Sequence, residues 1–348
     1  MSDEYIFRTL GNDEHEIWDS FVDRSPQGTL FHKTEWLSAN GLDYRIFGCY
    51  NRSRELVAGF VCGVEKLYGR WTFFTHPKIT PYLGNVYLDT EGKYVTQLSR
   101  NKKICYEIAN MLKTHCDTIN ITLSAYGVDD VMPFIWAGFS VSLRYTYILK
   151  LDNMDEVWKN VDDRLRNNVK KSRKDGLWID TECDFNETMV LAKKTFQRQG
   201  MELNANFIES AIGYERAMCC RSQCKSFIAK TKEGIPIAAL FMVWDKKRSY
   251  AIVSGHDFEN AHRGALKLTQ WASVEYTRNV LGLYEYDFEG TTLIHTERYI
   301  REFGGRLIPY YTIKWTHPKL RPLLTAKQFV RDIHHVFRPE PLNGRIRN

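Results

Sequence analysis

The sequence predicts an α+β protein of two similar halves, each with a mixed central sheet flanked by helices. The main observation is an internal repeat, because Glu16–Arg24 and Glu156–Arg164 both read as a helix that begins with Glu, an apolar residue and Trp. Two weaker echoes pair strand-like segments: Leu56–Val61 with Pro236–Phe241, and Ile119–Leu123 with Leu283–Asp287. Self-similarity over such distances indicates repeated structural units. Since only two copies occur, we interpret the chain as a duplicated domain rather than a solenoid.

The length and composition agree with two folded domains. The 348 residues are about two domains' worth, and 43% hydrophobic residues are enough for two cores, so global disorder is excluded. The first four residues, Met1–Glu4, are acidic and precede no apolar region of the kind a signal peptide needs. No run approaches the roughly 18 apolar residues that span a bilayer. The sequence therefore predicts a cytoplasmic protein.

In the first half, the patterns predict an α-α-β-β-β-loop-α-β-α-β unit. Gly41 ends the second helix, and turn residues separate the strands that follow it. The helices are expected at Glu14–Arg24, Lys33–Asn40, Lys102–Cys116 and Val131–Ala137. The strands are expected at Tyr44–Tyr50, Leu56–Leu67, Arg70–Thr75, Thr118–Ser124 and Ser140–Leu149. The loop His76–Gly84 is rich in proline and aromatic residues.

The second half repeats this order and opens with a helix from Asp155 to Gly176, which Asp152 or Asn153 can cap. One face of this helix is buried, because apolar residues recur at helical spacing: Trp158, Val161, Leu165 and Val169. Further helices are expected at Asn186–Gln199, Ala205–Cys219, Ala265–Asn279 and Thr291–Phe303. The strands are expected at Ser226–Lys230, Ile237–Asp245, Ser249–Ser254, Leu283–Phe288 and Arg306–Trp315.

These elements predict three regions along the chain. Residues 1–150 form the first domain, residues 151–315 form the second, and residues 316–348 form a basic appendage. The appendage contains one amphipathic segment, Ala326–Phe337. That segment suits peripheral contact with an anionic membrane, and docking onto the protein core is the alternative.

The order of elements, with a helix entered from a strand through a glycine-containing loop, resembles the GNAT acyltransferase fold. Two segments of the second half narrow the resemblance: Tyr286-Asp287-Phe288-Glu289-Gly290 and Arg301-Glu302-Phe303-Gly304-Gly305. Together with the duplication and the basic helix, they resemble the tandem-GNAT proteins of the Fem type and the related BioF2-like acyltransferases. The resemblance covers roughly residues 10–315. It implies two GNAT-like domains, with a degenerate first domain on the acceptor side and a second domain that binds the donor.

The resemblance also implies transfer of an acyl or aminoacyl group to an amine. Generic GNAT enzymes use acetyl-CoA or another acyl-CoA, whereas Fem-type enzymes that build peptidoglycan bridges use aminoacyl-tRNA. The pyrophosphate loop of CoA-dependent relatives reads Gln/Arg-x-x-Gly-x-Gly/Ala. The matching stretch here, Ala261–Leu266, lacks the first and last of these signature residues. Both donors therefore stay open, and the acceptor is expected to be a small or lipid-linked anionic molecule.

The loop His256–Ala265 is the candidate donor site. Backbone N–H groups at a helix N-terminus bind anions, Arg263 adds a charge, and Gly264 permits close approach. The expected donor-binding residues are Ser254, Gly255, His262, Arg263, Gly264 and Ala265, with the amides near Ser254 and Gly255 holding the oxyanion. In the first half we equate this loop with His76–Tyr82, whose prolines remove N–H donors. An ordinary helix start with Asn260 as cap is the alternative.

Asp287 and Glu289 are the candidate catalytic residues. They end a strand of the second half, where a carboxylate can accept the proton of an attacking amine. Two alternatives remain, because water relays that proton in many GNAT enzymes and because either residue also suits the cap of the following helix.

Net charge is +6, and much of the excess lies in the segment Arg164–Lys174. Local positive fields favour anionic partners. The expected substrate-binding cations are Arg166, Lys170, Arg173 and Lys174, which would hold either an anionic acceptor or tRNA phosphates. A solvated helix face is the alternative reading.

Tyr82 and Gln199 are expected to line the acceptor pocket between the halves, where binding sites often lie. Structural turn formation is the competing interpretation of the loop around Tyr82. The eight cysteines are irregularly spaced, and the cluster Cys219-Cys220-x-x-x-Cys224 lacks the second ligand pair of a zinc site. The sequence therefore predicts reduced structural thiols and no metal.

Three functions remain open from the sequence. The first is an acyl-CoA-dependent N-acyltransferase that acts on an amine of a sugar, peptidoglycan or polysaccharide precursor. The second is an aminoacyltransferase that uses aminoacyl-tRNA. The third is a binding protein of the same fold without catalysis.

Overall fold

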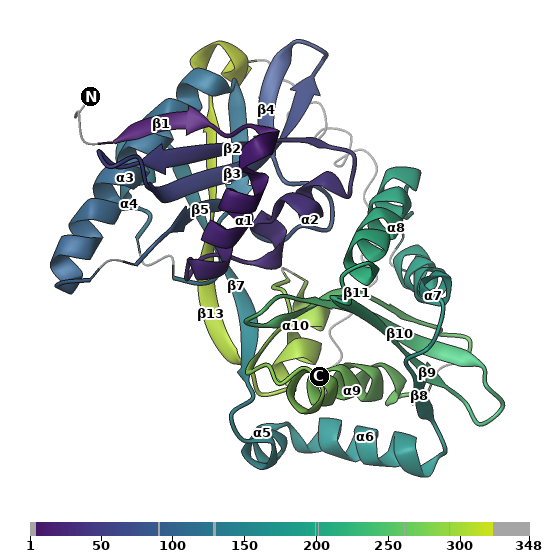
Figure 1. Ribbon diagram of the computed structural model, residues 1–348. Helices are drawn as coiled ribbons and strands as arrows, with labels where there is room; N and C mark the ends of the chain where they lie inside the picture. The colour runs from purple at the N-terminus through teal and green to yellow at the C-terminus, as the bar shows by residue number, and fades with distance from the viewer. Residues whose placement is uncertain are drawn as a thin grey trace.

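The computed structural model describes residues 5–89, 91–127, 130–198, 200, 202–260, 262–291 and 293–322. Within these ranges one mixed sheet runs through both halves (Figure 1). First-half strands are β1 Ile6–Thr9, β2 Asp43–Tyr50, β3 Leu56–Leu67, β4 Trp71–Thr75, β5 Gly84–Tyr87, β6 Thr118–Thr122 and β7 Ser140–Lys150. Second-half strands are β8 Trp178–Asp180, β9 Cys224–Lys230, β10 Pro236–Trp244, β11 Ser249–His256, β12 Glu285–Asp287 and β13 Arg306–Thr316.

Helices cover the sheet in both halves (Figure 1). The first half has α1 His15–Arg24, α2 Thr34–Ser38, α3 Tyr94–His115 and α4 Met132–Trp136. The second half has α5 Met154–Asn160, α6 Asp163–Lys174, α7 Phe185–Arg198, α8 Ala205–Cys219, α9 Ala265–Asn279 and α10 Ile294–Arg301. Short 3-10 turns lie at Asn12–Glu14, Leu30–His32 and Pro318–Leu320.

The two halves have matching topology, which confirms the predicted fold class. In the first half α3 crosses between the parallel strands β4 and β6, and in the second half α9 crosses between the parallel strands β11 and β12. The other strand pairs are antiparallel in the register described. The structure is therefore two tandem units, each a mixed sheet with a helical crossover.

The closing strands are exchanged between the halves, which the sequence did not predict. The sheet order is β1-β2-β3-β4-β6-β13-β7-β12-β11-β10-β9-β8, with β5 paired to β3. Thus β13 pairs with β6 of the first half, β7 pairs with β12 of the second half, and the two closing strands pair with each other. The domain boundary between residues 150 and 151 stays a prediction. Strand β7, which precedes this boundary, pairs with the second half, and β13, which follows it, pairs with the first half.

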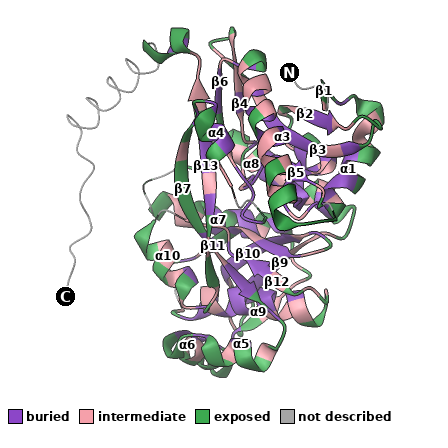
Figure 2. Cartoon of the chain, turned by 90° about the vertical axis from the view of Figure 1, so that its left-hand side faces the viewer, coloured by how far each residue is buried: buried purple, intermediate pink, exposed green. Residues whose placement is uncertain are grey.

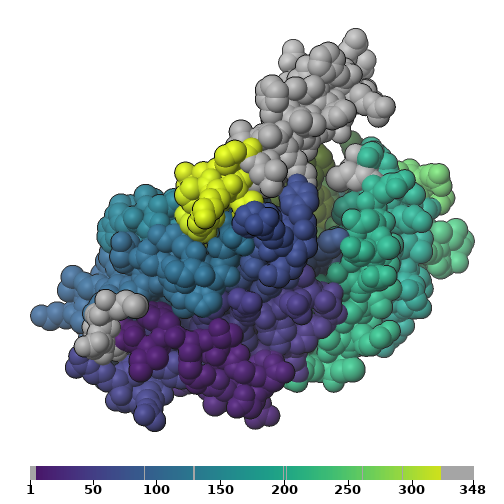
Figure 3. Space-filling model, turned by 90° about the horizontal axis from the view of Figure 1, so that it is seen from above, coloured from purple at the N-terminus to yellow at the C-terminus, as the bar shows by residue number. Residues whose placement is uncertain are grey.

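Among the described residues the core has three large clusters, of which the third lies between the halves, and a small fourth cluster of Leu191, Ile228 and Ala239. One cluster surrounds Trp18 and Phe60 in the first half, and another surrounds Trp271 and Tyr286 in the second. The third joins both halves, and in it the ring of Trp36 from α2 stacks on Tyr214 from α8 at 3.9 Å between centroids. Figure 3 shows the first half packed directly against the green α7–α8 region. Because aromatic burial of this kind is a large stabilising contribution, the halves form one packed unit.

The start of α3 and the connection before it differ from the prediction. Helix α3 begins at Tyr94 rather than at the predicted Lys102. The sequence did not indicate these first turns, because they are polar and carry little apolar periodicity. The connection before α3 is therefore Leu88–Lys93, which contains Asp89 and Glu91, and not the proline-rich stretch. That stretch instead separates β4 from β5, and both of these strands pair with β3.

The predicted helix from Asp155 to Gly176 is divided into α5 and α6. Asn153 caps α5 through its side chain, as predicted, and Asp162 caps α6 by accepting a hydrogen bond from the N–H of Arg164. Gly176 ends α6 with a φ of 88°, a backbone conformation that suits glycine. Among the described residues we find no helix whose length and apolar content would let it cross a bilayer. The amphipathic segment Ala326–Phe337 lies outside the described residues.

Candidate functional site

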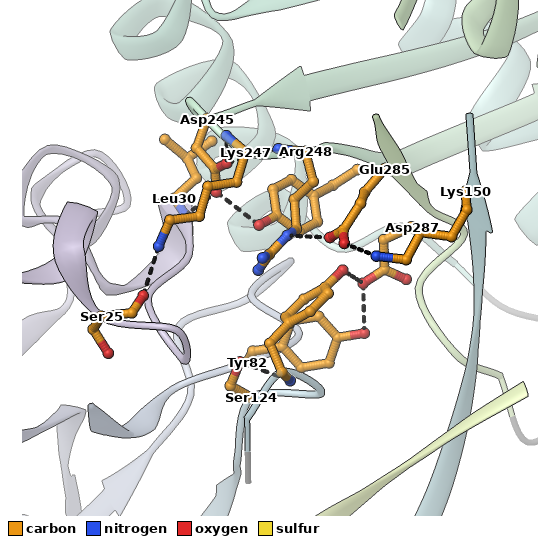
Figure 4. Close-up of polar contacts among 12 residues, drawn as sticks. Ser25, Leu30, Tyr82, Ser124, Lys150, Asp245, Lys247, Arg248, Glu285 and Asp287 are labelled. Atoms are coloured by element: carbon orange, nitrogen blue, oxygen red, sulfur yellow. Dashed lines mark hydrogen bonds and ion pairs between the residues drawn. The ribbon is translucent and has the colours of Figure 1, made fainter. Parts of the chain in front are cut away.

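Asp287, at the end of β12, is the centre of a buried polar cluster that joins the halves (Figure 4). Its carboxylate accepts hydrogen bonds from the hydroxyls of Tyr82 at 3.0 Å, Tyr126 at 2.8 Å and Thr146 at 2.7 Å. It also accepts one from the backbone N–H of Glu289 at 2.8 Å. Burial raises the pKa of Asp287, while these donors favour its charged form. The side chain has no exposed surface, so the structure favours a positioning role over the predicted contact with substrate.

Glu289 lies at the exit of the same strand and has different surroundings. Its residue is half-buried, and its Oε1 atom is buried without a hydrogen-bond partner. Burial, together with the nearby charge of Asp287, raises the pKa of Glu289 well above its ordinary value. Its φ of 51° is uncommon for a residue with a side chain, and such strain clusters at functional sites. Glu289 is therefore the better candidate of the two for proton transfer.

The chain beyond Glu289 is held tightly against both closing strands. A Cβ on Gly290 would lie 2.0 Å from the carbonyl oxygen of Tyr145 and 2.8 Å from the hydroxyl of Tyr310. Only glycine permits that approach, because no real Cβ atom comes so close to another atom. The position of Glu289 is therefore set by β7 and β13, the two exchanged strands.

A cavity of about 270 Å³ opens beside this strand exit. Its lining comes from both closing strands and from the chain that leads into α10: Leu143, Arg144, Tyr145, Tyr147, Thr291, Glu297, Leu307 and Tyr310. The hydroxyl of Tyr147 donates to Glu297 at 2.6 Å. Burial raises the pKa of Tyr310, and the neighbouring Arg144 opposes that shift. The cavity thus combines apolar walls with a few convergent polar groups, as substrate pockets do.

The predicted donor loop lies between β11 and α9. The two parallel strands β11 and β12 pair only at Ser249–Tyr286 and Tyr250–Asp287, so β11 leaves β12 beyond Tyr250. Asp257 shapes the loop by accepting hydrogen bonds from the backbone N–H groups of Glu259 and Asn260. The ammonium of Lys194, 2.8 Å away, holds the pKa of Asp257 below its usual range.

The amides at the start of α9 are already used within the chain. The Nδ1 atom of His262 lies 3.2 Å from the backbone N–H of Gly264, and the carbonyl of His262 accepts the N–H of Ala265. The Nε2 atom of His262 lies 2.9 Å from Asp175, which places a carboxylate beside the loop. These two amides therefore fit a pyrophosphate poorly. Arg263, which lies between His262 and Gly264 in the chain, is exposed.

The glycines predicted for ligand binding pack closely against helices. A Cβ on Gly264 would lie 2.2 Å from the hydroxyl of Ser172 and 2.5 Å from the carbonyl oxygen of Asn168, both on α6. A Cβ on Gly255 would lie 2.2 Å from the backbone of Leu191 and Ala192 on α7. Gly255 is therefore covered by α7, whereas its neighbour Ser254 is exposed.

Replacing Gly255 by alanine is expected to destabilise the protein by about 1 to 3 kcal/mol, because α7 must move away from β11. The measurement is the free energy of unfolding in denaturant. Ser254→Ala is the matched control, and we expect a change within about 0.5 kcal/mol for this exposed position. Equal stability of both variants would contradict the packing role of Gly255.

The structure divides the four predicted cations of the basic helix into two pairs. Arg166 folds back to donate to the carbonyl of Lys159 at 2.9 Å and also pairs with Asp163. Arg173 pairs with Glu275 of α9 at 2.8 Å. Lys170 and Lys174 are exposed. Figure 2 shows α6 as a largely exposed helix at the edge of the second half. The first pair stabilises the fold, and the second pair remains available to a ligand.

The proline-rich segment does not line a pocket at Tyr82. Tyr82 is fully buried, and the neighbouring Thr80 accepts a hydrogen bond from the indole of Trp36 at 2.9 Å. The predicted substrate contact of Tyr82 is therefore corrected to a structural one, because its hydroxyl is held by Asp287. Gln199 lies outside the described residues.

Sequence reasoning missed the charged neighbours of Asp287. The buried guanidinium of Arg248 lies 3.4 Å from the ring centre of Tyr126 and donates to Glu285 at 3.0 Å. Lys150 also pairs with Glu285 (Figure 4). These partners come from separate parts of the chain, so no local motif could have revealed them.

The cysteine cluster forms a contact between two thiols. The sulfurs of Cys219 and Cys224 lie 2.9 Å apart, and both cysteines are free. Within the described ranges, no three His, Cys, Asp or Glu side chains gather as a metal-binding group.

Comparison with known proteins identifies the fold. The family model described as "Acetyltransferase (GNAT) domain" matches residues 159–300. No curated protein gives a significant match. Among solved structures, FemX aligns with a TM-score of 0.65 at 16% identity, covering 88% of this chain and 96% of FemX.

Two further structures share the architecture. A tandem GNAT protein from the clavulanic acid biosynthesis pathway aligns with a TM-score of 0.53 at 12% identity, covering 89% of this chain and 98% of its own. The C-terminal domain of a putative lysylphosphatidylglycerol synthetase from Agrobacterium fabrum aligns with a TM-score of 0.55 at 10% identity, covering 90% and 95%. At these identities the structures establish the fold alone, and the matched domain supports acyl transfer as the class of reaction. Residues 159–300 thus match a GNAT acetyltransferase domain, which supports an acyltransferase, and the chain has the fold that FemX and the tandem GNAT protein share.

Proposed function

We propose that this protein is an N-acyltransferase that transfers an aminoacyl group from aminoacyl-tRNA to an amine of a sugar, peptidoglycan or polysaccharide precursor. The observation that carries the donor assignment is the start of α9. There, Nδ1 of His262 contacts the N–H of Gly264 and the carbonyl of His262 accepts the N–H of Ala265, so two of the amides that could bind a CoA pyrophosphate have partners within the chain.

The exposed cations support a polyanionic donor. Lys170, Lys171 and Lys174 are exposed on α6. Arg263 directly follows His262, which contacts Asp175 at the C-terminal end of α6. A nucleic acid is held mainly through its phosphates, so a basic surface of this kind suits tRNA better than one pyrophosphate. The same basic surface would also suit a lipid-linked acceptor, which is anionic. The cavity at Tyr310 is the proposed binding site for the amine of the acceptor.

Glu289 is the proposed proton acceptor. In the reaction, the amine nitrogen attacks the ester carbonyl, a C–N bond forms, and the C–O bond to the tRNA ribose breaks. The amine proton passes to Glu289, and the departing ribose oxygen takes up a proton. The raised pKa makes the ionised Glu289 side chain a stronger proton acceptor than an ordinary glutamate.

Acyl-CoA is the second candidate donor, because the matched GNAT domain spans this region. It requires that the pyrophosphate be held by side chains such as Arg263 rather than by the amides of Gly264 and Ala265. The membrane contact predicted for Ala326–Phe337 and the cytoplasmic location stay predictions.

The donor is tested by tRNA binding across a range of salt concentrations. We expect binding at low salt, and a variant with Lys170, Lys171 and Lys174 changed to Gln should reduce the slope of log affinity against log salt by about 2. The matched control neutralises three exposed lysines away from α6, Lys66, Lys93 and Lys319. That control should keep the wild-type slope.

Calorimetry with acetyl-CoA provides the opposing result. No tRNA binding at low salt, together with acetyl-CoA binding that Arg263→Glu abolishes, would replace aminoacyl-tRNA by acyl-CoA as the donor. A control triple that lowers the slope as much as the α6 triple would show that the interaction is unspecific.

A further inference from the structure

A second cavity lies in the first half and shares no lining residue with the cavity at Tyr310. It has a volume of about 290 Å³ and lies between β5, the first turns of α3 and the chain that follows β6. This is the first-half counterpart of the space around the donor loop, since α3 and α9 are equivalent crossover helices. Its size is near the lower end for small-molecule sites.

The floor of this cavity contains an unpartnered polar atom. Asn85 is only 3% exposed, and its side-chain amide donates to the hydroxyl of Tyr87 at 2.7 Å. Its Oδ1 atom is buried and accepts no hydrogen bond. Buried polar atoms are almost always partnered, so this oxygen calls for a ligand or a water that donates a hydrogen bond to it.

The charges around the cavity exclude a phosphate-bearing ligand. Asp89 accepts a hydrogen bond from the side chain of Gln97 at 2.8 Å, and Asp130 pairs with Lys102 at 2.8 Å. Among the described residues, the lining therefore has two carboxylates and one ammonium. An anion would meet a net negative field here, whereas hydroxyl groups would find both acceptors and amide donors.

An aromatic ring lies at the rim of the same cavity. Tyr94 lines the opening and is 66% exposed, so one face of its ring is accessible to a ligand. Planar amides and carboxylates around an accessible aromatic face match a sugar ring, which offers hydroxyl groups at its edge and C–H groups on its face.

We propose that this first-half cavity binds a single uncharged saccharide ring. A ring hydroxyl donates to Oδ1 of Asn85, Asp89 and Gln97 bind further hydroxyls, and Tyr94 stacks on the C–H face. The site involves no covalent step, and it goes beyond the proposed acyl transfer because none of its residues belongs to the second half.

The test is saturation-transfer NMR with the full-length chain and three probes at millimolar concentration: glucose, N-acetylglucosamine and inorganic phosphate. We expect transfer to the ring protons of both sugars, and no competition by phosphate. Asn85→Leu should weaken sugar binding at least about tenfold. Asn110→Leu is the matched control, because Asn110 lies on the same helix α3 as Tyr94 and bonds only to the carbonyl of Tyr106 in its own helix.

A second variant keeps the test decisive if Asn85→Leu does not fold. Gln97→Ala lies at the partly exposed wall and should also weaken binding, whereas Arg263→Glu in the second half should leave it unchanged. Absence of transfer from both sugars would overturn the proposal, as would binding that survives Asn85→Leu and Gln97→Ala. Competition by phosphate would overturn the assigned ligand class. None of these outcomes depends on the donor of the proposed reaction.

Discussion

Replacing Asp287 by alanine is expected to lower the free energy of unfolding by about 3 to 5 kcal/mol. The substitution leaves three buried hydroxyls, those of Tyr82, Tyr126 and Thr146, without their common acceptor. Each unpartnered buried group costs about 1 to 3 kcal/mol, although relaxation makes the sum smaller. Denaturant unfolding of the purified variant measures this change.

Conservative variants separate the contributions to this cluster. Tyr82→Phe and Tyr126→Phe each remove one donor and leave the carboxylate partnered, so we expect each to cost about 1 to 2 kcal/mol. Asp287→Asn keeps the size of the side chain and should fall between these values and Asp287→Ala. If Asp287→Ala were no less stable than Tyr82→Phe, the carboxylate would not be the common acceptor that joins the halves.

Replacing Glu289 by glutamine is expected to lower kcat by about 100- to 10,000-fold, the usual contribution of a positioned general base. Substrate binding should change little, because glutamine keeps the size and polarity of the side chain. Steady-state kinetics with the donor that the binding experiments support measures the separate effects on kcat and KM. An unchanged kcat would leave proton transfer to water, the alternative that the sequence leaves open.

The same variant is expected to be more stable than the wild type near neutral pH. The folded-state pKa of Glu289 is raised above its unfolded value, so the native state binds this proton more tightly. The resulting stability is present below the ordinary pKa of glutamate and is lost as pH rises through the folded-state pKa. The gain from Glu289→Gln should therefore disappear at about pH 4. A pH series of unfolding experiments checks this.

The two carboxylates thus have opposite expected signatures. Loss of Asp287 should cost both stability and activity, since its carboxylate also holds the backbone N–H of Glu289. Loss of the Glu289 charge should cost activity while increasing stability near neutral pH. A gain in stability on removing a buried, unpartnered charge is typical of residues retained for function.

Several parts of the fold could be predicted from local sequence. The cap at Asn153 and the end of α6 at Gly176 depend on neighbours a few residues away, so the pattern contained the necessary information. The start of α3 at Tyr94 could not be predicted, because the first turns of this helix face solvent and show little apolar periodicity. The sequence places Asp287 and Glu289 at one strand end, and it could not distinguish the environments of the two residues.

By itself, the sequence determined the duplicated α+β architecture, because apolar periodicity and turn residues act over short distances along each half. The tertiary structure alone decided that β7 and β13 exchange sheets, since alternation along a strand does not specify its partner. It also decided that Asp287 is enclosed while Glu289 is strained and partly exposed. Those environments depend on groups from segments as distant as Tyr82 and Tyr310, which meet only in the folded chain.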